Sequence, residues 1–212
     1  MQTTNNIGIL AYGSLINDPG NEIEPLIVNR LPCITPFNVE FARMSKSRDN
    51  APTLIPVNSD GAQVNAMILV LNNDTSLEEA FNMFWRRETR KVDITLKYKK
   101  VASPGNNTVQ IKLLNNFKGI NNVIYTSIAP NLGINTPQIL ARLAIDSILS
   151  EAGNKENDGI RYLLNAKKNG IITPLSQEYE RLILEYTHTD SLEETIIKLD
   201  KQRPIHQKKN SN

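Results

Sequence analysis

The apolar residues of this chain change their spacing near residue 136, and this change limits the folds that the chain can adopt. Before that point, short apolar runs alternate with turn residues, as is typical of β-strands. From Thr136 onward, the spacing of apolar residues indicates helices. The connections between the expected strands are short, which favours antiparallel pairing. The sequence therefore predicts an α+β fold with a small, mostly antiparallel sheet, flanking helices and a helical C-terminal region.

The strand-like part of the chain contains seven apolar stretches. Alternation between residues 37 and 42 predicts a half-buried strand, and the turn residues 58–61 predict a hairpin between the stretches on either side. The expected strands lie within residues 7–15, 33–44, 53–57, 63–71, 94–102, 108–114 and 122–129.

Capping residues indicate where the helices begin. Ser76 and Glu79 form a capping-box pattern, which predicts a helix that runs to about Thr89. Thr136 precedes a proline, as is typical of a helix N-terminus. The helices of the C-terminal region are expected over residues 136–152, 157–169, 174–186 and 191–201.

Length and composition favour one domain. The chain has 212 residues, of which 40% are hydrophobic, and this is enough for one well-filled core. We expect a single domain over residues 1–201. Residues 202–212 have no apolar pattern, so we expect them to form a disordered tail.

Charge and cysteine content argue against several classes of protein. The 24 basic and 22 acidic residues are interspersed, so the formal charge of +2 predicts no nucleic-acid partner. The single cysteine, Cys33, cannot form an internal disulfide and fits a reducing compartment. We find no signal-peptide pattern and no run near the ~20 apolar residues of a membrane helix. We therefore expect a cytoplasmic protein without a membrane partner, and the oligomeric state stays open.

Common cofactor and metal motifs are missing from the sequence. It contains neither a phosphate-binding P-loop nor a dinucleotide fingerprint. His188 and His206 have no cysteine or aspartate at a useful spacing, so neither a metal site nor a catalytic triad is expected.

The first apolar run ends abruptly at Tyr12-Gly13-Ser14. A glycine at a strand end lets the backbone approach a ligand closely, and consecutive free amides can hold an anion. The same pattern is typical of an ordinary turn, so it indicates a binding loop only if a second group accompanies it.

Glu88, near the end of the helix that starts at Ser76, is the candidate second group. At ~100° per residue it continues the stripe of Leu77, Phe81 and Phe84, which predicts that its carboxylate points to the core side. The neighbouring residues Arg86, Arg87 and Arg90 are expected to project to other sides. A carboxylate among apolar groups has a raised pKa and can carry protons near neutral pH. The alternative is a glutamate that is solvent-exposed at a frayed helix end or paired with a nearby arginine.

These two motifs together resemble the γ-glutamylcyclotransferase-like family, whose members open with a Y-G-[ST]-L loop and carry a catalytic glutamate further on. Here the loop is Tyr12 to Leu15, and the glutamate stands in the pair Arg87-Glu88. That pair, with Leu140-Ala141-Arg142 and Tyr162-Leu163 further along, is most similar to the ChaC-type, glutathione-directed branch. The resemblance spans roughly residues 7–184.

The resemblance implies a small β-barrel flanked by helices, and an enzyme that needs no cofactor. It would cyclise a small γ-glutamyl substrate to 5-oxoproline and release an amine or peptide. Glu88 would be catalytic. The substrate-binding residues would be Tyr12, Gly13, Ser14, Leu15 and Tyr125.

Two features of the sequence leave other interpretations open. Family members commonly place Gly-Tyr after the glutamate, whereas this chain has Thr89-Arg90. A catalytically inactive γ-glutamyl-binding protein is therefore an alternative. A third interpretation, an interaction protein that uses the basic tail after Lys201, depends on charge alone.

Overall fold

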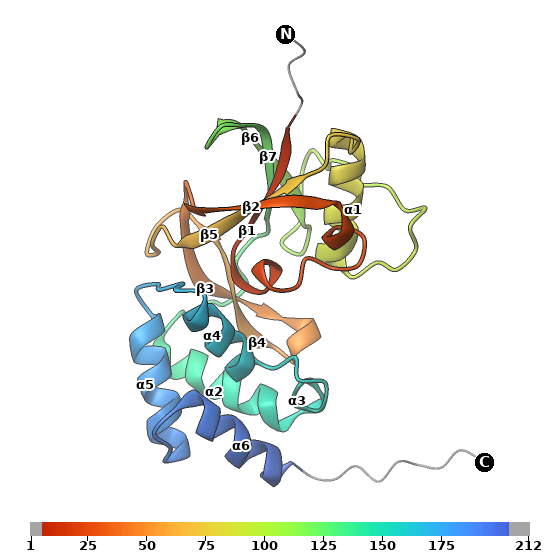
Figure 1. Cartoon of the computed structure of the whole chain (residues 1–212). Coiled ribbons are helices and arrows are strands. Elements are labelled where there is room, and N and C mark those ends of the chain that lie inside the picture. Colours follow the sequence, from red (N-terminus) through yellow and green to blue (C-terminus); the bar gives the residue numbers. More distant parts are fainter. Residues whose placement is uncertain (1–5, 204–212) are drawn as a thin grey trace, which may run out of the picture.

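A computed structural model describes residues 6–203, which form a sheet region and a helical region (Figure 1). The strands are β1 (Ile7–Ala11), β2 (Ile27–Ile34), β3 (Asn38–Ser45), β4 (Ala51–Val57), β5 (Asn65–Leu71), β6 (Gln110–Phe117) and β7 (Ile120–Ser127). The α-helices are α1 (Leu77–Thr89), α2 (Pro137–Leu149), α3 (Glu151–Asn154), α4 (Gly159–Lys168), α5 (Ser176–Thr187) and α6 (Leu192–Gln202). Short 3-10 helices occupy η1 (Gly13–Ile16), η2 (Glu24–Leu26) and η3 (Lys46–Arg48).

The strands form two sheets. A five-stranded sheet has the order β2-β5-β1-β7-β6, in which only the pair of β1 and β7 is parallel. Strands β3 and β4 form a separate antiparallel pair that lies between this sheet and the C-terminal helices (Figure 1). The α+β class is confirmed. The closed barrel that the family resemblance implies is not found among the described strands, which form two sheets.

Strand β1 lies at the centre of the sheet, and both of its faces are covered. Ile7, Ile9 and Ala11 pack on the α1 side, while Leu10 packs on the opposite side. Alternation along β1 therefore fixes which face of the sheet carries α1. It also brings the end of β1, where the Tyr12 loop starts, toward the end of that helix.

Helix α1 begins and ends where the sequence predicts. The Ser76 hydroxyl accepts a hydrogen bond from the Glu79 amide, and the Glu79 carboxylate accepts one from the Ser76 amide. This reciprocal capping box satisfies amides that the first helical turn leaves free. Phe84 is fully buried against the sheet, so its stripe faces the core as expected.

The C-terminal helices pack around a second apolar cluster that includes Phe41 and Tyr179. The predicted cap at Thr136 is confirmed, and the side chains of Asp158 and Ser191 cap α4 and α6. The helix expected over residues 136–152 is interrupted at Ser150, whose side chain caps the short helix α3. Asp158 fixes the start of α4, which carries Tyr162 toward the sheet region.

Strand β2 is absent from the prediction. It is an edge strand of the larger sheet and most of its residues are exposed, so its sequence lacks buried alternation. It also contains Pro32, which edge strands tolerate because one of their sides needs no hydrogen-bond donor. The short 3-10 helix η2 leads directly into it.

The strand expected over residues 37–42 is present as β3, but it is not half-buried, and the expected hairpin is wrong. The four residues Val39 to Ala42 are all buried, because the face predicted to be exposed is covered too: Glu40 binds Thr173 and Leu175, which precede α5. Strands β4 and β5 do not pair with each other: β4 pairs with β3, whereas β5 pairs with β1 and β2. Periodicity identifies strands, but it does not identify their partners.

Residues 94–102 do not form the expected strand. Their backbone groups bind side chains of α1 instead of a neighbouring strand. Arg86 donates to the Leu96 carbonyl at 2.7 Å, and Asn82 Oδ1 accepts from the Tyr98 amide at 2.8 Å. The segment therefore lies against α1 as an irregular loop.

The expected tail mostly lies outside the described residues. Gln202 still belongs to α6, and residues 204–212 are beyond the described part. The interpretation that depends on the basic tail stays a prediction. Within residues 6–203, none of the helices is long and apolar enough to cross a membrane.

Candidate active site

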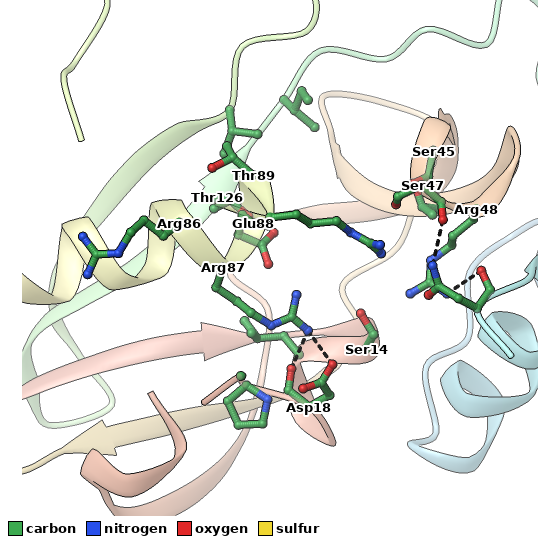
Figure 2. A pocket seen from close by; sticks show the side chains of 18 of the residues that line it. Ser14, Asp18, Ser45, Ser47, Arg48, Arg86, Arg87, Glu88, Thr89 and Thr126 are labelled. Atoms are coloured by element: carbon green, nitrogen blue, oxygen red, sulfur yellow. Dashed lines mark hydrogen bonds and ion pairs between the residues drawn. The ribbon is translucent and has the colours of Figure 1, made fainter. Parts of the chain in front are cut away.

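A pocket of about 1190 Å³ lies beside the C-terminal end of α1. Its walls come from separate parts of the chain that include the loop after β1, the η3 turn after β3, strand β4, the end of α1, strand β7 and α4. Figure 2 shows Glu88 and Arg48 on opposite sides of a common space.

The Glu88 carboxylate borders this pocket from the last turn of α1. The side chain is half-buried, and Thr126 Oγ1 donates a hydrogen bond to Glu88 Oε2 at 3.1 Å. Burial raises the pKa of Glu88, and the charges of Arg87 and Arg90 together with the Thr126 hydrogen bond oppose that increase. The Glu88 carboxylate is thus fixed by a hydrogen bond, has a raised pKa, and is accessible to a ligand in the pocket.

The residues after β1 lie at the same pocket as Glu88. Tyr12, Ser14 and Leu15 line it, so the two motifs that the sequence singles out are brought together. Ser14 and Leu15 lie in the first turn of η1, where helical amides have no intrahelical acceptor. Their N–H groups are therefore suited to hold an anionic oxygen.

Gly13 is buried in the loop, next to Tyr162, and is not one of the residues that line the pocket. Its φ is +74°, and an added Cβ would lie 2.7 Å from Tyr162 Oη. Only glycine fits here without displacing the tyrosine, because the left-handed backbone and the close side chain both exclude a Cβ.

Tyr125 does not line the pocket. It stacks on Phe37, with the ring centroids 4.5 Å apart, on the face of the sheet opposite α1. Successive residues of a strand point to opposite faces, so the next residue, Thr126, points to the pocket in its place.

Two tyrosines close the inner end of the pocket. The Tyr12 hydroxyl donates to the Thr126 carbonyl at 3.1 Å, and the Tyr162 hydroxyl accepts from the Leu54 amide at 3.3 Å. Burial raises the pKa of both, and the charge of Glu88 raises both further. Both phenols therefore stay neutral near pH 7, and they form polar but uncharged walls.

The arginines next to Glu88 take different directions. Arg86 turns away from the pocket centre to a buried ion pair with Glu22, as Figure 2 shows. The expectation that Arg87 and Arg90 also point away is wrong, because both line the pocket and their charges act on Glu88. Arg90 leaves the helical phase because it is a left-handed C-cap, with a φ of +55°.

Arg87 and Arg48 line the pocket on different sides. Arg87 is paired with the Asp18 carboxylate at 2.9 Å. The Arg48 guanidinium lies 4.6 Å from the centroid of the Tyr162 ring, at cation–π distance. Arg48 belongs to η3, far from Glu88 in sequence, and Figure 2 shows it across the pocket from Glu88.

Sequence reasoning missed four lining residues: Thr126, Tyr162, Arg48 and Arg90. Only Thr126 had a local signal, because it alternates with Tyr125 on an expected strand. Tyr162 and Arg48 come from distant segments, and their meeting depends on how α4 packs against β4. Among residues 6–203, no group of three or more histidine, cysteine or acidic side chains could hold a metal ion.

Comparison with known proteins leaves the family open. No protein-family model matches the chain, and no curated protein has a matching sequence.

Proposed function

We propose that this chain is a γ-glutamylcyclotransferase-like enzyme that converts a γ-glutamyl peptide or amine into 5-oxoproline and a free amine. One observation carries the proposal: the half-buried Glu88 borders the same pocket as Ser14 and Leu15 of the loop after β1. The resemblance of the Tyr12 to Leu15 loop and of Arg87-Glu88 to the motifs of that family supports it.

The proposed reaction takes its nucleophile from the substrate. The α-amino nitrogen attacks the γ-carbonyl carbon and closes a five-membered ring, and the bond to the leaving nitrogen then breaks. A substrate held in a folded conformation gains an intramolecular advantage that can supply ~7 kcal/mol or more of the barrier. Holding that conformation is the role of the pocket walls, including the neutral Tyr12.

Glu88 would transfer the protons in this reaction. The bound α-amino group arrives as an ammonium, which has no lone pair with which to attack. Glu88 in its carboxylate form accepts one proton from the ammonium and later donates it to the leaving nitrogen. The second proton, which the ring nitrogen loses as it becomes an amide, goes to the released amine, which departs as an ammonium ion. Burial raises the pKa of Glu88 toward neutral pH, which suits one group for both roles.

The loop after β1 would stabilise the charge that develops on the γ-carbonyl oxygen. Ser14 and Leu15 are in the first turn of η1 and line the pocket, so their amides are the candidate donors. A single well-placed donor of this kind can lower a barrier by about 3 kcal/mol.

The test is an assay of the purified chain with glutathione and a panel of γ-glutamyl peptides and amines. We expect 5-oxoproline and the free amine in equal amounts, measured by mass spectrometry. Heat-inactivated protein gives the background from spontaneous cyclisation. If no substrate of the panel yields product above that background, the proposed activity is wrong.

The position of Arg90 favours a second candidate, a γ-glutamyl-binding protein without turnover. Arg90 lines the pocket beside Glu88, where the family commonly has the Gly-Tyr pair. Calorimetry distinguishes the two functions: binding of γ-glutamyl ligands without product would favour the binding protein, and product would exclude it.

A further inference from the structure

Basic side chains outnumber acidic ones in the lining of the pocket. Its lining includes eight basic and four acidic side chains. Three of the basic residues are already paired: Arg86 with Glu22, Arg87 with Asp18 and Lys155 with Glu151. The arginine ion pairs within residues 6–203 include neither Arg48 nor Arg90.

Arg48 is held in place without a carboxylate partner. Its guanidinium lies over Tyr162, and its Nη1 donates to the Asn157 carbonyl at 3.3 Å. Burial lowers the pKa of Arg48, and repulsion from Arg90 and Arg87 lowers it further. A guanidinium presents five N–H donors in a rigid fork, so most of the Arg48 donors remain for a ligand.

Arg90 comes from the opposite wall, at the C-cap of α1. Burial and the charge of Arg87 lower the pKa of Arg90, and the charges of Asp18 and Glu88 partly oppose this. Like charges that are brought together destabilise one another until an anion lies between them. Arg48 and Arg90 are therefore two cations at one pocket that no acid within residues 6–203 neutralises by direct ion pairing.

The pocket is also large. Its volume of about 1190 Å³ exceeds the roughly 300–1,000 Å³ of common small-molecule sites. A γ-glutamyl group at Glu88 and the Ser14 amides would fill only the inner end. Space remains across to Arg48, on the side where the leaving half of a substrate would lie.

We propose that the leaving half of the γ-glutamyl substrate is itself acidic, with two carboxylates that bind Arg48 and Arg90. This inference rests on the proposed function and narrows its substrate class to γ-glutamyl peptides whose next residue is a dicarboxylic amino acid. Carboxylates match the fork of a guanidinium and form charge-assisted, bidentate hydrogen bonds with it. Arg87 and Asp18 remain paired nearer to Glu88.

The first test compares three substrates whose leaving halves carry different numbers of carboxylates. These are γ-glutamylglutamate, γ-glutamylglycine and γ-glutamylethylamide, with two, one and no leaving carboxylates. We expect kcat/KM to fall in that order, by about tenfold to a hundredfold for each carboxylate that is removed from the leaving half. We also expect added salt to weaken the preference, because it screens the charges. Equal values for all three substrates would overturn the inference.

Variants then identify the responsible groups. In Arg48→Gln and in Arg90→Gln, we expect the preference for γ-glutamylglutamate over γ-glutamylethylamide to shrink by about tenfold or more. The matched control is Arg142→Gln, an exposed arginine on α2 that does not line the pocket, and it should keep the preference. If Arg48→Gln fails to fold, Arg90→Gln still tests the inference, because Arg90 is exposed and its substitution should leave the fold intact. A preference that survives both substitutions would overturn the inference.

Binding measurements separate this inference from the proposed reaction. Calorimetry with the Glu88→Gln variant reports affinity for the same three compounds without turnover. Tighter, salt-sensitive binding of γ-glutamylglutamate without any product in the wild type would uphold the acidic subsite and reject the reaction. Turnover of all three compounds at equal kcat/KM would uphold the reaction and reject the acidic subsite.

Discussion

The hydroxyl of Thr126 donates a hydrogen bond of 3.1 Å to Glu88 Oε2, and this bond joins strand β7 to the last turn of α1. The backbone carbonyl of the same threonine accepts a hydrogen bond from Tyr12, at the start of the β1 loop. Thr126 therefore connects both halves of the candidate site. Its two bonds set the orientation of the carboxylate relative to the loop.

Thr126→Val should raise the pKa of Glu88. Valine keeps the shape of the side chain but cannot donate to the carboxylate, while burial continues to disfavour the charged form. We expect the acidic limb of the kcat/KM profile to move to higher pH, because Glu88 must be deprotonated to act as a base. Thr126→Ser keeps the hydroxyl and should keep the wild-type limb. A limb that stays in place in the valine variant would show that this bond does not influence Glu88.

Gly13→Ala should destabilise the fold more than an alanine at another glycine with a similar backbone. Gly119 has a φ of +81° and no neighbour within 4 Å of an added Cβ, so Gly119→Ala incurs only the backbone strain, about 1–2 kcal/mol. At Gly13 the new Cβ also meets Tyr162, which Phe41 and Arg48 hold in place. We expect Gly13→Ala to lose at least about 1 kcal/mol more in urea unfolding. Equal losses would mean that Tyr162 moves aside freely.

Glu40 should make stability depend on pH. It is 1% exposed, and its carboxylate accepts hydrogen bonds from Thr173 Oγ1 and from the Phe41 and Leu175 amides. Burial nevertheless raises the pKa of Glu40 above its usual 4.5. The folded state thus holds this proton more tightly than the unfolded state does. The associated stability is complete below pH 4.5 and is lost as the pH rises through the raised pKa.

Urea unfolding at a series of pH values tests this expectation. Glu40→Gln removes the titrating group, so the unfolding free energy of the wild type should fall relative to that of the variant as the pH rises above 4.5. Parallel curves for the two proteins would contradict the assignment.

Features that depend on neighbouring residues could be predicted from the sequence. The capping box at Ser76 and the helical phase of Glu88 both follow from spacing within one helix, and the structure has both. The end of β1 at the Tyr12 loop is equally local. These features were enough to bring Glu88 and the loop to one pocket.

Features that depend on distant partners could not be predicted. Strands β4 and β5 look like a hairpin in sequence, but each finds a different partner. Exposed strand β2 has no buried alternation to reveal it. The direction of Arg90 depends on its left-handed C-cap, and Arg48 reaches the pocket only because η3 lies beside Tyr162. The sequence also did not show which face of β7 borders the pocket, so the prediction named Tyr125 in place of its neighbour Thr126.

The most direct test of the proposed site is the rate of 5-oxoproline formation by Glu88→Gln. Glutamine keeps the size of the side chain but cannot accept the substrate proton, so we expect kcat to fall by about 10²- to 10⁴-fold. Glu78→Gln is the matched control, since Glu78 is an exposed residue of the same helix, and it should keep wild-type kcat. Wild-type kcat in a folded Glu88→Gln protein would contradict the role of Glu88 as the proton carrier.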